Sequence, residues 1–157
     1  MEAYPSAMAS TSESEIPVPA PDGHPGARFG LPAEGPASVA SLSRRVFALV
    51  VDWLLGYLIA LLLVGPDPFE SPYLQWAVLG VWFVITALPV AFFGASAGMV
   101  ALGIRVASIG STAVIGLPRA LLRTLLVALV VPPLIRDADE RGWHDRATRS
   151  IVVRTRA

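Results

Sequence analysis

Residues 44–65, RRVFALVVDWLLGYLIALLLVG, decide the fold of this chain. Between Val46 and Gly65 the only charged residue is Asp52. About 20 predominantly apolar residues in a helix are needed to cross the ~30 Å hydrocarbon core of a bilayer. Pro66 ends the run, because a proline inside a helix lacks the backbone N–H donor and clashes with the preceding turn. The stretch therefore predicts a membrane-spanning helix over about 44–65.

A second apolar run, YLQWAVLGVWFVITALPVAFF, covers residues 73–93. It is also long enough to span, and it begins with Tyr73 and Trp76, whose side chains favour the membrane–water interface. Only the short acidic segment 66–72 separates the two runs. We therefore expect an antiparallel transmembrane hairpin.

A third apolar stretch, about 117–135, is interrupted by arginines and by a Pro-Pro pair. Apolar runs shorter than a full span are more often re-entrant or interfacial. The sequence thus predicts an all-α membrane protein with a two-helix hairpin and a third membrane-embedded or re-entrant helical segment. The small-residue region 94–118 allows two short paired strands, LGIRVAS and STAVIG, or an interfacial helix over 96–104.

Composition agrees with a membrane domain. The chain of 157 residues is 54% hydrophobic and 15% charged, against about 25% charged in an ordinary soluble domain. Its mean hydropathy is +0.62. Residues 1–40, rich in Pro, Ser and Ala, show no periodicity and are expected to form a disordered cytoplasmic tail before a membrane domain over 41–154. The absence of cysteine excludes disulfides and thiolate chemistry, and a net charge of zero gives no reason to expect a nucleic-acid partner.

The basic residues predict the orientation. All twelve are arginine, a usage typical of GC-rich genomes such as those of actinobacteria. Arginines precede the first run and follow the second, whereas 66–72 has none. Because basic loops stay in the cytoplasm, we expect a multi-pass protein of the bacterial plasma membrane with a cytoplasmic N-terminus. The six arginines after residue 135 favour a cytoplasmic C-terminus as well.

Asp52 is the most informative single residue. A carboxylate near the middle of a spanning helix costs roughly 2.5–3.5 kcal/mol on insertion scales, so such residues are usually paired or functional. Arg45 lies seven residues earlier and therefore on the same helix face. We predict an intramembrane charge network in which Asp52 pairs with an arginine of the third segment; its members are Arg45, Asp52, Arg105, Arg119 and Arg123.

The C-terminal stretch contains a second polar motif, His144-Asp145-Arg146, which we expect at the membrane surface. No nucleophile or second acid accompanies it in sequence. Two distant histidines and no cysteine make no metal site. The sequence therefore predicts no catalytic residue, no metal and no cofactor.

In this order and spacing the motifs resemble the RDD family of membrane proteins, named for one Arg and two Asp. The resemblance covers roughly residues 41–154. It implies that Arg45, Asp52 and Asp145 are the three name-giving residues. The other matching motifs are Gly94-x-x-x-Gly98, Leu102-Gly103-Ile104-Arg105-Val106, Arg119-x-x-x-Arg123 and the Val152-Val153 pair. The family usually carries Gln, Thr, Pro and Lys around its glycine turn, and this chain has Ala95, Ser96, Ala97 and Met99 instead.

Three functions are compatible with these features. The first is a non-enzymatic accessory or scaffold component of a membrane complex, because two or three segments enclose no pathway. The second is a homo-oligomeric cation or proton transporter that uses Asp52, an activity also suggested for the RDD family. The third, an enzyme acting on lipid head groups, has only His144-Asp145 and the arginines in its favour. The expected partners are the lipid bilayer and either further copies of the chain or another membrane protein.

Overall fold

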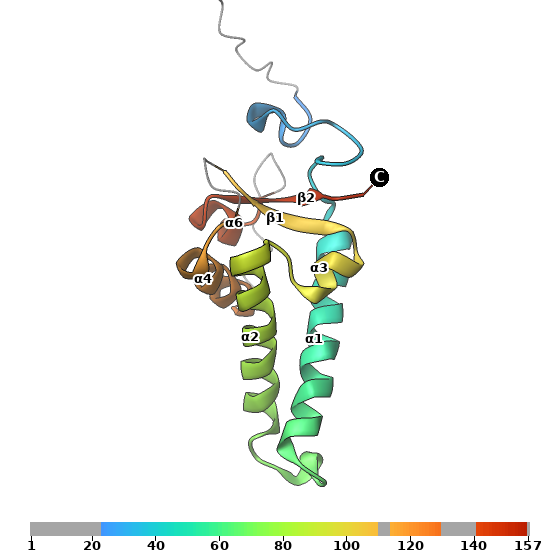
Figure 1. The fold of residues 1–157 in the computed structure, drawn as a ribbon, viewed down its shortest axis with the longest axis vertical. Helices are drawn as coiled ribbons and strands as arrows, with labels where there is room; N and C mark the ends of the chain where they lie inside the picture. Colours follow the sequence, from blue (N-terminus) through green and yellow to red (C-terminus); the bar gives the residue numbers. More distant parts are fainter. Residues whose placement is uncertain (1–22, 110–113, 130–140, 157) are drawn as a thin grey trace, which may run out of the picture.

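A computed structural model describes residues 23–109, 114–129 and 141–156. Two long helices form a hairpin with a short 3₁₀ turn in its loop, and the other described elements gather at its open end (Figure 1). In chain order the elements are the 3₁₀ turn η1 (Ala27–Phe29), α1 (Leu42–Val64), the 3₁₀ turn η2 (Pro68–Glu70), α2 (Leu74–Phe93), α3 (Ala97–Ala101), β1 (Ile104–Ser108), α4 (Leu117–Ala128), α6 (Trp143–Ala147) and β2 (Ser150–Arg154).

The hairpin consists of α1 and α2. Both helices are long and apolar enough to cross a membrane, so the two expected runs are confirmed as candidate spans. They pack closely because Gly56 of α1 faces Trp82 of α2: a Cβ at Gly56 would lie only 2.9 Å from the Trp82 Cβ. Small residues allow such approach between apolar helices. The Trp53 and Trp82 rings stack beside this contact, with centroids 4.8 Å apart.

Glycines end both helices of the hairpin. α1 stops at Gly65, whose φ of 113° is outside the range that side chains tolerate, and Pro66 follows. α2 stops at Gly94 in the left-handed conformation, with φ 75°. The Gly94 N–H donates to the Val90 carbonyl at 3.1 Å, so it satisfies one of the free carbonyls at the helix end.

We call residues 37–40, α3, β1, α6 and β2 together the cap. β1 and β2 are antiparallel, with Val106 opposite Val152 at the centre of the register. The other edge of β2 is taken by residues 37–40: the Ala40 N–H donates to the Val152 carbonyl at 2.9 Å, and Val39 bridges Val153. β2 therefore lies between a segment that precedes α1 and a strand that follows α2. Its buried Val152 belongs to one apolar core with Ala48 of α1 and Val90 of α2.

The cap corrects three predictions. The fold is mostly helical, but it is not all-α, because β1 and β2 form a sheet. β1 falls in the expected strand LGIRVAS, yet its partner is the C-terminal strand β2 rather than STAVIG, of which residues 111–113 are outside the described part. Residues 37–40 are paired rather than disordered, since they occupy the free edge of β2. The expected disorder of residues 1–22 lies outside the described residues.

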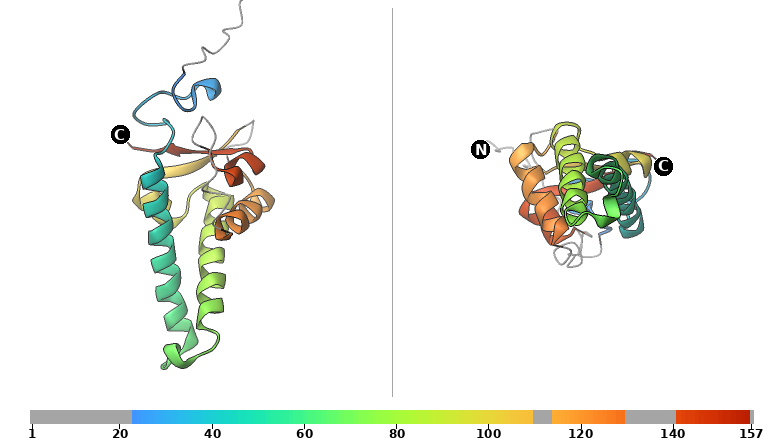
Figure 2. Two further views of the ribbon diagram at one scale, coloured as in Figure 1. Left: turned by 180° about the vertical axis from the view of Figure 1, so that it is seen from behind. Right: turned by 90° about the horizontal axis from the view of Figure 1, so that it is seen from below.

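α4 is shorter than the predicted third segment. It covers 12 residues, and residues 130–135 of the expected 117–135 helix are not described. The described helix packs on α2 near the open end of the hairpin and is steeply inclined to both long helices (Figures 1 and 2). A third span is thus not shown by the described residues.

Candidate functional site

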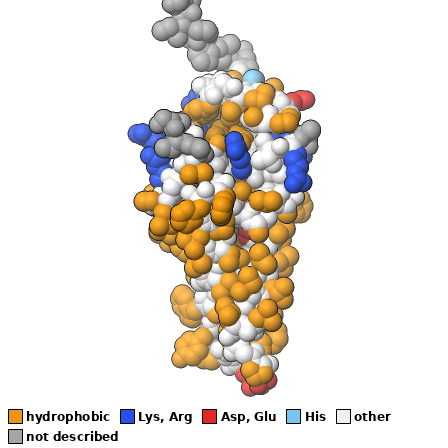
Figure 3. Space-filling view, viewed as in Figure 1, with side chains coloured by type: hydrophobic (Ala, Val, Ile, Leu, Met, Phe, Trp, Pro, Cys, Tyr) orange, Lys and Arg blue, Asp and Glu red, His pale blue; other side chains and the backbone are white. Residues whose placement is uncertain are grey.

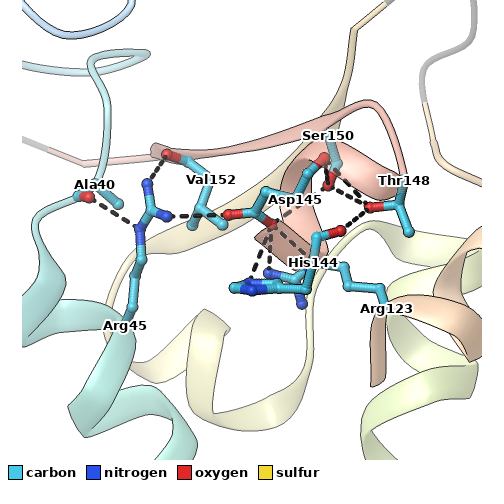
Figure 4. Close-up of polar contacts among 8 residues, drawn as sticks. All are labelled: Ala40, Arg45, Arg123, His144, Asp145, Thr148, Ser150 and Val152. Atoms are coloured by element: carbon cyan, nitrogen blue, oxygen red, sulfur yellow. Dashed lines mark hydrogen bonds and ion pairs between the residues drawn. The ribbon is translucent and has the colours of Figure 1, made fainter. Parts of the chain in front are cut away.

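Four ionisable side chains from three helices converge where the cap meets α1 and α4 (Figure 4). Arg45 comes from the first turn of α1, Arg123 from α4, and His144 and Asp145 from α6. We call them the arginine–aspartate cluster. Asp145 is its centre, because its side chain is fully buried and both of its oxygens are engaged.

The two arginines hold opposite oxygens of Asp145. Arg123 donates through Nε to Oδ1 at 3.1 Å, and its Nη2 lies 3.1 Å from the same oxygen. Arg45 donates through Nη1 to Oδ2 at 3.1 Å and through Nε to the Ala40 carbonyl at 3.0 Å. Arg45 therefore joins the start of α1 to residue 40 and to α6. The cluster ties helices together that are 100 residues apart in sequence.

The electrostatics keep Asp145 ionised. Burial alone raises the pKa of its carboxyl. The electrostatic interactions with Arg123, His144 and Arg45 and the hydrogen bond from Arg123 outweigh burial, so the pKa of Asp145 lies below its ordinary value. The His144 Nε2 is 3.4 Å from Oδ1. A carboxylate held by cations in this way is a structural counter-ion rather than an available proton acceptor.

Asp52 has different partners from those expected. It is 2% exposed, and its Oδ2 accepts a hydrogen bond from the Ser96 hydroxyl while its Oδ1 accepts one from the Gly98 N–H at 2.7 Å. Ser96 in turn caps α3, because its Oγ accepts from the Met99 N–H at 3.3 Å. The prediction that Asp52 pairs with an arginine of the third segment is therefore wrong for the described residues: of the two arginines there, Arg123 binds Asp145 and Arg119 is exposed.

The remaining predicted site residues are not brought together. Arg105, Arg119 and Arg146 are exposed on β1, α4 and α6. Ser96 and Gly98, the two donors to Asp52, were not predicted to be site residues. Neither were Thr148 and Ser150, which lie where α6 connects to β2 and whose hydroxyls are 2.9 Å apart. The sequence signal for Gly98 was the Gly94-x-x-x-Gly98 spacing. A glycine is needed at position 98 because the chain returns onto α1 there.

A cavity of about 90 Å³ adjoins the cluster. Its walls come from α1, α2, α4 and the cap, and they are largely apolar. Arg45, Arg123 and His144 contribute its charged lining, and Thr86 and Thr124 contribute hydroxyls. Asp52 does not line this cavity.

Chemically, the site offers charge pairing and anion-binding donors. In the part of the chain that the structure describes, no group of His, Asp or Glu side chains is arranged to hold a metal ion. Comparison with known proteins adds no assignment: no family model, no curated protein and no solved structure matches the chain. The RDD resemblance accordingly stays a prediction.

Proposed function

We propose that the chain is a membrane-embedded accessory or scaffold protein of the RDD type in a bacterial plasma membrane. One observation carries the membrane part of this proposal: the polarity of α1 and α4 is inverted. In these two helices small and polar side chains face inward, and large apolar ones face outward. In water this arrangement would be unstable, whereas in lipid it is expected.

α1 illustrates the inversion. Its buried residues are Ala48, Asp52, Gly56 and Ala60, whereas Leu62 and Leu63 are 77% and 70% exposed. Only 22% of the most apolar stretch of α1 and 33% of that of α2 is buried. The core helix of a soluble protein would be mostly buried, so this exposure favours lipid as the surrounding medium.

α4 repeats the pattern at the open end of the hairpin. It buries Ala120, Arg123 and Thr124. It exposes five leucines on its outer surface and at its end, namely Leu117, Leu121, Leu122, Leu125 and Leu129. A helix with leucines outward and an arginine inward is suited to the interface of a bilayer, with its apolar face in the acyl region. Arg119 is exposed and would reach lipid phosphates.

The sheet supports one orientation. β2 pairs both with residues 37–40 before α1 and with β1 after α2, so all three segments must lie on one side of the membrane. Arginines gather at this end of the molecule, and acidic side chains mark the opposite tip, where the loop of Asp67 and Glu70 lies (Figure 3). By the positive-inside rule, the cap and both termini would be cytoplasmic.

Single cysteines test this topology cleanly, because the chain has none of its own. We expect Thr155→Cys to be labelled by a membrane-impermeant maleimide only after the cells are opened, and Glu70→Cys to be labelled on intact spheroplasts. Both side chains are exposed. The wild-type chain gives the background. Labelling of Thr155→Cys from outside would overturn the orientation.

The partners of the buried carboxylates support the accessory role. Two spans enclose no pathway, and the two carboxylates that are buried among the described residues are bonded within the chain: Asp145 by arginines and Asp52 by Ser96 and Gly98. The homo-oligomeric transporter remains the second candidate because Asp52 is buried in a candidate spanning helix. The two candidates differ in whether Asp52 exchanges a cation or only packs α3.

Reconstituted vesicles with a trapped pH-sensitive dye separate the two candidates. We expect no flux driven by an imposed proton or Na⁺ gradient, and no difference between the wild-type chain and Asp52→Asn. Flux that Asp52→Asn abolishes in a folded protein would reject the accessory role. In mild detergent, native mass should show a stoichiometric second membrane protein; a homo-oligomer free of other proteins would favour transport.

A further inference from the structure

The cavity beside the arginine–aspartate cluster contains hydroxyls that lack partners. Thr86 of α2 is 5% exposed and Thr124 of α4 is 1% exposed, and both line the cavity. Neither Oγ1 has a hydrogen-bond partner in the described structure. A buried hydroxyl without a partner costs roughly 1–3 kcal/mol, so two on one cavity indicate an absent acceptor.

The charge of the cavity indicates what that acceptor is. Among the described residues, the ionisable side chains that line it are Arg45, Arg123 and His144, and no acid does. Arg123 is 4% exposed, so its guanidinium is shielded from bulk solvent. Its Nε and Nη2 hold Asp145, and because a guanidinium carries five N–H donors, others remain for a phosphate or carboxylate oxygen. The donors and the charge therefore both select an anion.

The volume of the cavity and its position along the hairpin favour a lipid head group. A water needs roughly 10–15 Å³ of such space, so about 90 Å³ accommodates a group of several heavy atoms. Leu42 and Val46 of the first α1 turns line it and are 38% and 47% exposed on the apolar surface. Thr86 lies seven residues before the end of α2, about 10 Å below it. An acyl chain attached to the anion would continue along this apolar surface.

We propose that this cavity binds the phosphate of an acidic membrane phospholipid, with Arg123 and the hydroxyls of Thr86 and Thr124 as donors. The inference rests on the proposed membrane embedding. The lipid head group would fill the space between α1, α2 and α4 and couple the interfacial helix to the hairpin. The protein would thereby recognise membranes that contain acidic lipid.

The test compares the full chain with the double variant Thr86→Val/Thr124→Val, in nanodiscs of phosphatidylcholine alone or with phosphatidylglycerol. Native mass spectrometry after release into detergent measures which lipid is retained. We expect the wild-type chain to retain phosphatidylglycerol at least about tenfold over phosphatidylcholine, and the double variant to lose that preference. Valine keeps the shape of threonine, and these hydroxyls have no protein partner, so the double variant should fold. Thr155→Val, at an exposed position, is the matched control and should behave as wild type.

Other outcomes overturn the proposal. Equal retention of the two lipids by the wild-type chain, or an unchanged preference in the double variant, would show that this cavity is not a phospholipid site. Displacement of the lipid by inorganic phosphate at millimolar concentration would identify a site for the free anion instead. Flotation with phosphatidylcholine vesicles tests membrane embedding separately. A chain that floats but has no preference refutes the lipid site alone, and a chain that does not float refutes the membrane proposal.

Discussion

Asp145→Asn should destabilise the protein by about 3–5 kcal/mol, because it removes the one carboxylate that both arginines hold. The Arg123 and Arg45 side chains are 5% and 14% exposed, so water replaces little of the lost charge. Asparagine fills the same volume and still offers an oxygen. The loss of stability would therefore measure the contribution of the negative charge rather than that of side-chain packing.

The same carboxylate predicts an acid-sensitive fold. The pKa of Asp145 is lowered in the folded chain by the neighbouring cations, against about 3.9 in an unfolded one. A lowered folded pKa means that its stabilisation is fully present above about pH 4 and is lost as the pH falls through the folded pKa. The variant should lack this contribution, so its stability should fall less steeply with acid than that of the wild-type chain.

Unfolding by SDS in dodecyl maltoside micelles, followed by circular dichroism at pH 7 and at decreasing pH, measures both effects. Asp67→Asn is the matched control, since Asp67 is exposed on the distal loop. It should shift the unfolding free energy by less than about 0.5 kcal/mol. A similar small shift for Asp145→Asn would mean that the cluster contributes little to stability.

The sequence predicted the hairpin well because it depends on local composition. Length and apolar content alone set the approximate limits of α1 and α2. The cap depends on contacts between distant residues. Val106 and Val152 are 46 residues apart, and nothing in the intervening sequence specifies their pairing.

The polar partners were predicted less well for the same reason. Helical periodicity placed Arg45 and Asp52 on one face of α1, but it carries no information about which later segment returns to that face. Asp145, expected at the membrane surface as part of a motif, is instead the buried counter-ion of two arginines. Charge matching alone favoured an Asp52–arginine pair, whereas the fold satisfies Asp52 with a hydroxyl and a backbone N–H.

The second large effect concerns Gly98, where α3 returns onto α1. Gly98→Ala should destabilise the chain by about 3–5 kcal/mol. A Cβ there would overlap the Ala48 carbonyl oxygen and would lie 3.0 Å from the Asp52 Cγ. The clashing atom of Ala48 belongs to the backbone of α1, which cannot change rotamer as a side chain can, so α3 must move away. That movement would break the Gly98 N–H bond to Asp52 and leave a buried carboxylate short of a donor.

Gly80→Ala provides the comparison within the same chain. Gly80 lies inside α2 with nothing within 4 Å of its added Cβ, so alanine there should stabilise the helix by roughly 0.5–1 kcal/mol. SDS unfolding of both variants measures the contrast. A Gly98→Ala variant as stable as wild type would show that α3 does not rest on α1. The double variant Gly98→Ala/Asp52→Asn should lose less stability than the two single losses added together, because both changes break the same α1–α3 contact.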